Sequence, residues 1–342
     1  MAILVTGGTG YIGSHTVVEL LKIGEDVVIV DNLSNSKKVV LDRIYKITGK
    51  KPRFYEFSVQ NQDKLNDLFK KEHITDVIHF AGLKSVSESH KYPEMYFENN
   101  VGSTAALLLA MIEHKVYNLV FSSSATVYGN PARVPILETD KVGDTASPYG
   151  ATKYQIEVML KEIQAVSSKM NIAILRYFNP IGAHKSGLIG EDPNGIPNNL
   201  MPYIAQVASG KHPHLNVYGD DYKTIDGTGV RDYIHVVDLA KGHLSALKKL
   251  KDNCGLVIYN LGTGKGTSVL ELVRAFEEVN HVNIPFVIMP RRAGDVDECY
   301  ANVDLALNEM NWNANLTIED ACRDTWNFQK RNPNGYDESE KK

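Results

Sequence analysis

The chain has 342 residues, of which 43% are hydrophobic, and its formal net charge is -4 at pH 7. This length predicts one large domain with a sizeable core and a smaller second lobe. The mild acidity gives no reason to expect nucleic acid or an anionic membrane surface as a partner. No apolar run reaches the roughly 20 residues that a bilayer crossing needs, so we expect no membrane partner either.

The cysteines and histidines show no metal-binding or disulfide pattern. Cys254, Cys299 and Cys322 lack paired spacing and are typical of reduced cytosolic thiols. His212 and His214 have no third ligand at a suitable spacing, so no metal is expected. The N-terminus enters a strand pattern without a basic region or cleavage site. We therefore expect a cytoplasmic protein.

The first strand pattern leads into a glycine-rich turn. Residues 2–5 form a short apolar run, followed by Gly7, Gly10 and Gly13 and a helix-compatible stretch to residue 23. Glycines at such a turn let the backbone approach a pyrophosphate at the helix N-terminus. The order of strand, glycine turn and helix predicts a dinucleotide site.

A carboxylate ends the second strand pattern. Residues 26–30 are followed by Asp31, 18 residues beyond Gly13. A carboxylate there accepts hydrogen bonds from adenosine ribose hydroxyls and repels a 2′-phosphate. We therefore favour NAD over NADP as cofactor. The alternative is that Asp31 only caps a turn or helix.

The strand–helix alternation continues along the chain. Further strand patterns cover residues 53–57, 76–80, 118–121 and 172–177, with helical patterns between them, including residues 93–114. This predicts an α/β fold, a Rossmann-type doubly wound parallel sheet with a smaller C-terminal substrate-binding lobe. We expect residues 1–180 to form the NAD-binding domain and residues 181–342 mainly the second, with segments near 230–262 returning to the sheet.

A tyrosine and a lysine stand four residues apart just after Pro148. At helical spacing Tyr149 and Lys153 lie on one face. An ammonium close to a phenol favours the phenolate, so we expect the pKa of Tyr149 to fall from about 10 towards neutral. Tyr149 would then accept a proton from a sugar or alcohol hydroxyl. Alone, the motif also fits an ordinary surface helix.

The glycine pattern, Ser124 at a strand end and the Tyr149/Lys153 pair together resemble the extended short-chain dehydrogenase/reductase superfamily. Within it, several blocks resemble the UDP-glucose 4-epimerase family: residues 80–84, 177–184, 197–202, 226–235, 290–295 and 324–326. The resemblance runs from residue 2 to about residue 336.

The resemblance implies an isomerase of galactose metabolism that interconverts UDP-glucose and UDP-galactose. Tyr149 would take the proton from the sugar 4-hydroxyl, and Lys153 would hold the phenolate and the nicotinamide ribose. Ser124 would hydrogen-bond the 4-oxygen and help relay the proton. NAD would accept the C4 hydride and return it to the other face of a rotated 4-keto sugar, remaining tightly bound throughout.

The resemblance also implies two sets of contacts. The cofactor contacts are Gly7, Gly10, Tyr11, Ile12, Gly13, Asp31, Asn32, Asn35, Ser58, Val59, Phe80, Ala81, Gly82, Lys84, Asn99, Ser122, Tyr149, Lys153, Tyr177 and Phe178. The UDP-hexose contacts are Lys84, Ser124, Tyr149, Asn179, Asn199, Leu200, Asn216, Tyr218, Arg231, Tyr233, Arg292, Asp295 and Cys299. Ser58 departs from the family, which often has Asp there to bind the adenine.

Three of these residues have a second interpretation. Arg231 and Arg292 fit a diphosphate clamp, because guanidinium groups match phosphate oxygens; the alternative is an ion pair with Asp232 or Asp295. Cys299 is small where some family members carry Tyr beside the sugar 2-substituent. It predicts activity on UDP-GlcNAc and UDP-GalNAc too, unless it is only a small thiol filling space.

Competing functions differ in the residues that they need. A nucleotide-sugar 4,6-dehydratase needs an Asp-Glu pair where this chain has Ala125 and Thr126, so it is set aside. An epimerase of UDP-glucuronate or a UDP-pentose stays open. A silent NAD-binding regulator would not need Ser124, Tyr149 and Lys153 together. The resemblance finally implies a homodimer, formed through the helices at 93–114 and 149–169.

Overall fold

A seven-stranded parallel sheet forms the centre of the computed structural model, which describes residues 1–193, 195, 197–292 and 294–336. Its strand order is β11-β6-β5-β4-β1-β2-β3. The strands are β1 (Ala2–Thr6), β2 (Val27–Asp31), β3 (Arg53–Glu56), β4 (Ile74–His79), β5 (Asn118–Ser124), β6 (Asn171–Tyr177) and β11 (Leu256–Leu261). The predicted Rossmann-type α/β fold is confirmed, and β11, from the 230–262 region, lies at the sheet edge beside β6.

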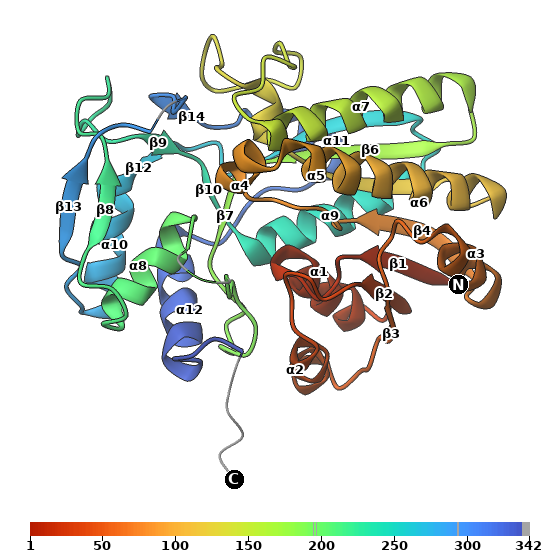
Figure 1. Cartoon of the computed structure of the whole chain (residues 1–342), viewed down its shortest axis with the longest axis horizontal. Helices are drawn as coiled ribbons and strands as arrows, with labels where there is room; N and C mark the ends of the chain where they lie inside the picture. Colours follow the sequence, from red (N-terminus) through yellow and green to blue (C-terminus); the bar gives the residue numbers. More distant parts are fainter. Residues whose placement is uncertain (194, 196, 293, 337–342) are drawn as a thin grey trace.

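Helices cover both faces of this sheet (Figure 1). One face carries α1 (Tyr11–Lys22), α2 (Val39–Thr48), α9 (Val236–Leu250) and α11 (Asp304–Met310). The other carries α3 (Gln62–Lys71), α6 (Gly102–Glu113) and α7 (Pro148–Val166). Alternate strand residues pack to opposite faces, Ile3 and Val5 to the first and Leu4 to the second. All five residues of β1 are therefore buried, which explains its continuous apolar run.

The predicted helix at 93–114 is interrupted. It consists of α5 (Pro93–Tyr96), a π-turn η1 (Phe97–Val101) and α6, and it follows the short α4 (Val86–Lys91). Buried Asn100 lies in the π-turn. Its Oδ1 accepts a hydrogen bond from the Leu83 amide at 2.7 Å, and its Nδ2 donates to Thr152 Oγ1 at 3.0 Å. The π-turn thus holds the loop after β4 against α7.

The second lobe lies beyond one end of the sheet, at the left of Figure 1. It contains α8 (Leu200–Ala208), β8 (Leu215–Tyr218), α10 (Val269–Asn280), β13 (Phe286–Met289) and α12 (Ile318–Arg331). Ile204, Val217 and Phe276 pack in its separate core. Within the described part of the chain, none of the helices has the length and apolar character needed to cross a membrane.

Short strands connect the two lobes. β7 (Asn179–Ile181) pairs in parallel with β10 (Tyr233–His235). β9 (Val230–Arg231) lies between β12 (Thr267–Ser268) and β14 (Glu298–Cys299). A 3-10 turn, η2 (Ala125–Tyr128), follows β5 directly. Of these elements, η2 continues the chain from β5 and β7 continues it from β6.

A buried ion pair fixes α7 on the sheet. Arg176 of β6 donates to Glu157 of α7 through Nε at 3.0 Å and through Nη2 at 2.6 Å, with the two side chains 1% and 0% exposed. Ser123 Oγ donates to the same carboxylate at 2.7 Å, and Arg176 Nη1 donates to Tyr128 Oη at 3.0 Å. Such a pair contributes little net stability, but removing one partner is costly.

Replacing Glu157 by Gln tests this anchor. The substitution leaves the Arg176 guanidinium buried without its counter-charge, so the free energy of unfolding should fall by about 3–5 kcal/mol. Urea denaturation measures the change. Lys141→Ala is the control, because it breaks only a fully exposed ion pair with Asp144 and should change stability little. Equal stabilities of the two variants would contradict the role given to the buried pair.

Candidate active site

The carboxyl ends of the parallel strands meet at one edge of the sheet, and the predicted cofactor residues follow them. Gly7, Gly10, Tyr11, Ile12 and Gly13 come after β1, and Asp31, Asn32 and Asn35 end or follow β2. Ser58 and Val59 come after β3, Phe80 to Lys84 after β4, and Ser122 lies two residues before the end of β5. Tyr177 ends β6 and Phe178 follows it, whereas Asn99 lies in η1. The sheet therefore gathers residues that are scattered in sequence.

The glycine turn has the close packing that a dinucleotide cradle needs. Gly7 has φ +70°, and a Cβ there would come within 2.8 Å of the Ala81 amide nitrogen. A Cβ on Gly13 would come within 2.2 Å of the Gly7 carbonyl oxygen. Gly10 caps α1 without any side-chain hydrogen bond, so the first-turn N–H groups point to the space before the helix. This geometry fits the pyrophosphate of NAD.

Asp31 connects the second strand with this turn. Its Oδ2 accepts a hydrogen bond from the Thr9 amide at 3.1 Å, and its Oδ1 accepts from the Leu33 amide at 2.9 Å and from Ser36 Oγ at 3.0 Å. Asp31 thus has the turn-forming role that we considered as its alternative. The same contacts hold its carboxylate beside the glycine turn, where the adenosine ribose of a dinucleotide is expected.

Tyr149 and Lys153 lie on the first turns of α7, and both are buried. The helix begins as its sequence predicts, with Pro148 in the first turn and Ser147 Oγ accepting the Gly150 amide at 3.1 Å. Lys153 Nζ lies 6.0 Å from the centre of the Tyr149 ring and donates to the Ser122 carbonyl at 2.8 Å. The ammonium therefore contacts the strand end rather than the phenol oxygen.

The pKa of Tyr149 shifts in the direction opposite to the one we expected. Burial raises it well above its ordinary value, the nearby Tyr177 raises it further, and the hydrogen bond with Ser124 offsets only part of this. Burial also lowers the pKa of Lys153 to about 8. Desolvation of the phenolate therefore decides the direction of the Tyr149 shift, while the Lys153 ammonium donates its hydrogen bond to the Ser122 carbonyl.

Ser124 completes this group at the end of β5. Its Oγ accepts hydrogen bonds from the Thr126 amide at 3.2 Å and from Thr126 Oγ1 at 3.1 Å. Two residues earlier, Ser122 Oγ donates to Tyr177 Oη at 3.2 Å. Ser124 of β5 and Tyr177 of β6 both lie near enough to the buried phenol of Tyr149 to shift its pKa.

The predicted sugar-nucleotide residues lie on the elements that join the lobes and on the second lobe itself. Asn179 begins β7, Asn199 caps α8, Leu200 begins α8, Asn216 and Tyr218 lie in β8, Arg231 ends β9, Tyr233 begins β10, and Cys299 ends β14. Backbone pairing aligns Asn179 with Tyr233 and Arg231 with Cys299. The Asp232 amide donates to the Cys299 carbonyl at 3.1 Å, and the Asn179 amide donates to the Asp232 carbonyl at 3.0 Å.

Arg231 and Arg292, the two arginines among the predicted UDP-hexose contacts, have different partners. Arg231 Nη2 forms an ion pair with Asp295 at 3.2 Å, and the Arg292 guanidinium lies 4.0 Å from the centre of the Tyr218 ring. Arg231 therefore forms an ion pair with Asp295, which was the alternative to its role in a diphosphate clamp. Asp232 instead accepts the Thr263 amide at 2.7 Å, and burial raises the pKa of its carboxyl. Guanidinium groups so placed can bind phosphate oxygens and stack on a ring.

Glu191 was not predicted, although it contacts one residue of the cofactor set and one of the UDP-hexose set. Glu191 Oε1 accepts hydrogen bonds from Lys84 Nζ at 3.1 Å and from Asn199 Nδ2 at 2.6 Å. It thereby joins the loop after β4 to the cap of α8. Asn100 was missed as well. Neither residue had a signal in the sequence, because each acts on partners that are distant in the chain.

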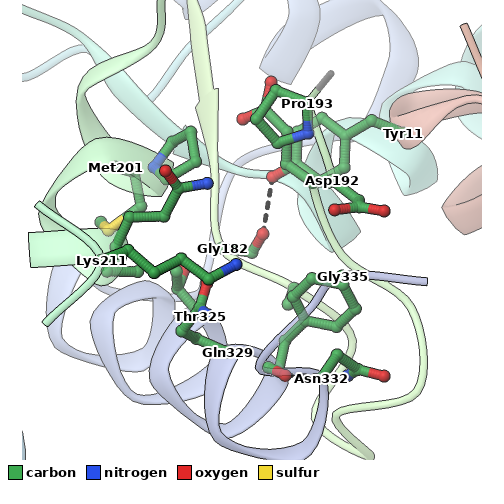
Figure 2. A pocket seen from close by; sticks show the side chains of 16 residues that line it. Tyr11, Gly182, Asp192, Pro193, Met201, Lys211, Thr325, Gln329, Asn332 and Gly335 are labelled. Atoms are coloured by element: carbon green, nitrogen blue, oxygen red, sulfur yellow. Dashed lines mark hydrogen bonds between the residues drawn. The ribbon is translucent and has the colours of Figure 1, made fainter. Parts of the chain in front are cut away.

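A small cavity lies between the lobes beside Tyr11 (Figure 2). Tyr11 Oη donates to the Gly182 carbonyl at 2.6 Å across it, and Thr325 and Gln329 of α12 form part of its wall. Its volume of about 20 Å³ suits ordered water and not a sugar nucleotide. Tyr149 does not line it, so this cavity belongs to the joint between the lobes.

Comparison with known proteins gives the family. The NAD dependent epimerase/dehydratase family matches residues 3–262. The UDP-glucose 4-epimerase of Pasteurella multocida (strain Pm70) is 56% identical over 336 residues, which cover 98% of this chain and 99% of that protein.

Two solved structures share the fold over nearly the whole chain. The UDP-glucose 4-epimerase of Stenotrophomonas maltophila, with bound NAD and formylated UDP-arabinopyranose, has a TM-score of 0.95 and 51% identity, covering 97% of this chain and 98% of its own. The enzyme of Bifidobacterium longum, in complex with NAD+ and UDP, has a TM-score of 0.95 and 50% identity, covering 98% and 100%. The resemblance seen in the sequence is confirmed, and the chain belongs to the NAD dependent epimerase/dehydratase family and, within it, to the UDP-glucose 4-epimerases.

Proposed function

We propose that this protein uses tightly bound NAD to interconvert UDP-glucose and UDP-galactose. The observation that carries the proposal is the buried group of Tyr149, Lys153 and Ser124 at the sheet edge that also holds the glycine turn and Asp31. Bound NAD would supply the group that accepts the C4 hydride of the sugar and returns it. Side chains of this protein would bind the substrate and accept the proton of its hydroxyl group.

Tyr149 is the proposed proton acceptor for the sugar 4-hydroxyl. Its raised pKa means that the phenolate needs positive charge nearby to form at neutral pH. Lys153, with a pKa of about 8, is mainly protonated at pH 7 and supplies that charge. As the pH rises above about 8, the ammonium is lost and this support weakens. Ser124 donates a hydrogen bond at the same place.

The substrate assignments are proposals supported by the arrangement of the second lobe. Arg231 and Arg292 would bind the diphosphate, and Tyr218 lies beside Arg292 where it can stack on a base. We keep the division into an NAD-binding part, residues 1–180, and a mainly UDP-hexose-binding part, residues 181–342, as a prediction. UDP-glucuronate and UDP-pentoses remain the alternative substrates within the same chemistry.

Cys299 supports a wider substrate range. The residue ends β14 opposite Arg231 and packs in the cluster that contains Phe178, one of the proposed cofactor contacts. A thiol at this junction takes less room than the phenol of some relatives. We propose that it leaves space for the N-acetyl group of UDP-GlcNAc and UDP-GalNAc.

The outer face of α6 supports the proposed homodimer. Leu109 is 63% exposed and Ile112 is 44% exposed, although both are apolar. Burying such side chains against a second copy would be favourable. The cytoplasmic location also remains a proposal, supported by Cys254, Cys299 and Cys322, which form no disulfide.

The proposal predicts that Tyr149→Phe removes epimerisation. Loss of a positioned proton acceptor costs about 10²–10⁴-fold, so kcat should fall by at least 100-fold while UDP binding changes little. Conversion of UDP-galactose measures kcat, and calorimetry measures UDP affinity. Tyr154→Phe is the control, because Tyr154 lies on the same helix and packs against Gly143. Undiminished turnover of Tyr149→Phe would refute the mechanism.

Cys299→Tyr should narrow the substrate range. A bulky phenol at this position would hinder the N-acetyl sugars, so the ratio of UDP-GalNAc to UDP-galactose turnover should fall at least about tenfold, as expected when a pocket loses room for a substituent. Cys299→Ser is the control and should keep the parent ratio, because its size is similar. If Cys299→Tyr leaves the ratio unchanged, the proposed role of Cys299 in admitting the N-acetyl group is wrong.

Leu109→Glu should weaken the dimer. A carboxylate buried in an apolar contact is costly, so the variant should dissociate to a single chain of 38.0 kDa at concentrations where the parent has twice that mass. Sedimentation equilibrium distinguishes these states. Ile225→Glu, an 84% exposed position in the second lobe, is the control and should stay dimeric. A monomeric parent protein would exclude the proposal.

A further inference from the structure

The hydroxyl of Ser124 has its hydrogen-bonding capacity almost fully assigned. A serine hydroxyl has one proton to donate and two lone pairs that accept. Both lone pairs are engaged by Thr126, whose backbone N–H lies at 3.2 Å and whose Oγ1 donates at 3.1 Å. Only the Ser124 proton remains available for a further hydrogen bond.

Packing at η2 holds this arrangement in place. The Ser124 side chain caps η2, and Thr126 lies in its first turn. A Cβ on Gly150 would come within 3.1 Å of the Thr126 carbonyl oxygen, so the turn packs directly against the start of α7. Gly150 is the neighbour of Tyr149. The Thr126 donors and the phenol therefore approach Ser124 from two elements in close contact.

We propose that Thr126 is a positioning residue that fixes the direction of the Ser124 O–H, so that Ser124 donates towards the phenol oxygen of Tyr149 and does not accept from it. This inference rests on the proposed function and concerns the proton step within it. Thr126 itself need not touch the substrate. It acts by filling the two acceptor positions of its neighbour.

The arrangement changes the part played by Ser124 in the proton step. A relay must accept one proton and release another, which requires a lone pair that can accept. With both lone pairs engaged, the Ser124 proton stays on Ser124. The O–H bond of the sugar hydroxyl breaks and a new O–H bond forms directly at the Tyr149 phenolate oxygen. Ser124 stabilises the phenolate as a fixed donor.

Removing the Thr126 hydroxyl should reverse this preference. Ser124 would regain one accepting lone pair and could then accept a hydrogen bond from the neutral phenol. The neutral phenol would gain a hydrogen-bond acceptor that the phenolate cannot use, so the pKa of Tyr149 would rise. Other charged and titratable groups around the phenol and its lysine stay unchanged, namely Lys153 and Glu157 on α7, Tyr177 and Arg176 on β6, Tyr96 on α5 and His79 on β4.

The matched variants are Thr126→Val and Thr126→Ser. Val keeps the shape and the backbone N–H but lacks Oγ1, whereas Ser keeps the hydroxyl. In Thr126→Val, the low-pH side of the plot of kcat against pH should move to higher pH by about one unit. The kcat at neutral pH should then fall about tenfold, as expected for one hydrogen bond to a charged group. The KM for UDP-galactose and the bound NAD should stay at the parent level. Thr126→Ser should keep the parent profile.

A second readout does not depend on turnover. The ultraviolet difference spectrum between each protein and its Tyr149→Phe counterpart follows the phenolate during a pH titration. Thr126→Val should ionise at higher pH than the parent, and Thr126→Ser should not. If Val fails to fold, Thr126→Ala serves instead and must show the same displacement.

The outcomes separate this inference from the proposed function. Suppose that Thr126→Val changes neither the pH dependence of kcat nor the phenolate titration, and that Tyr149→Phe is inactive. This result would overturn the role of Thr126 and leave the proposed function intact. Full activity of Tyr149→Phe would overturn both. A loss of stability or a rise of KM without any pH displacement would show that Thr126 is only structural, which also contradicts the inference.

Discussion

The burial of a phenol and an ammonium at the same strand ends is the constraint on which the rest of the site depends. Tyr149 and Lys153 are 7% and 5% exposed, and neither charged form is favourable there without polar partners. The Ser122 carbonyl binds the ammonium, and Ser124 lies beside the phenol. Such contacts require α7 to stay fixed on β5 and β6, which the buried Glu157 carboxylate achieves further along the helix.

Polar contacts also join the sheet lobe to the second lobe. Tyr11, at the start of α1, donates to the Gly182 carbonyl just after β7, while Glu191 connects Lys84 with Asn199. These contacts bring the glycine turn, the loop after β4 and the cap of α8 together. Tyr11, Lys84 and Asn199, which we propose to bind ligands, thus also take part in the contacts that join the two lobes.

Much of the site could be predicted because its residues sit in strong local patterns. The glycine turn and Asp31 follow buried strands, and the Ser147 cap and Pro148 mark the start of α7. The contacts of Asn100 and Thr126 could not be predicted, because they depend on the folded geometry. Asn100 joins the loop after β4 to α7, and Thr126 fills the acceptor positions of Ser124. The partners of Asn100 become neighbours only after the chain has folded, whereas Thr126 reaches Ser124, two residues away, only in the turn geometry of η2.

The sequence by itself determined the parallel sheet, the glycine turn after the first strand and the family, because apolar runs, glycine spacing and motif blocks are properties of consecutive residues. The tertiary structure alone decided the electrostatics. At helical spacing Lys153 should have lowered the pKa of Tyr149, yet burial raises it. Spacing fixes which side chains share a helix face, but desolvation depends on what covers that face, and the covering residues come from β5, β6 and η1.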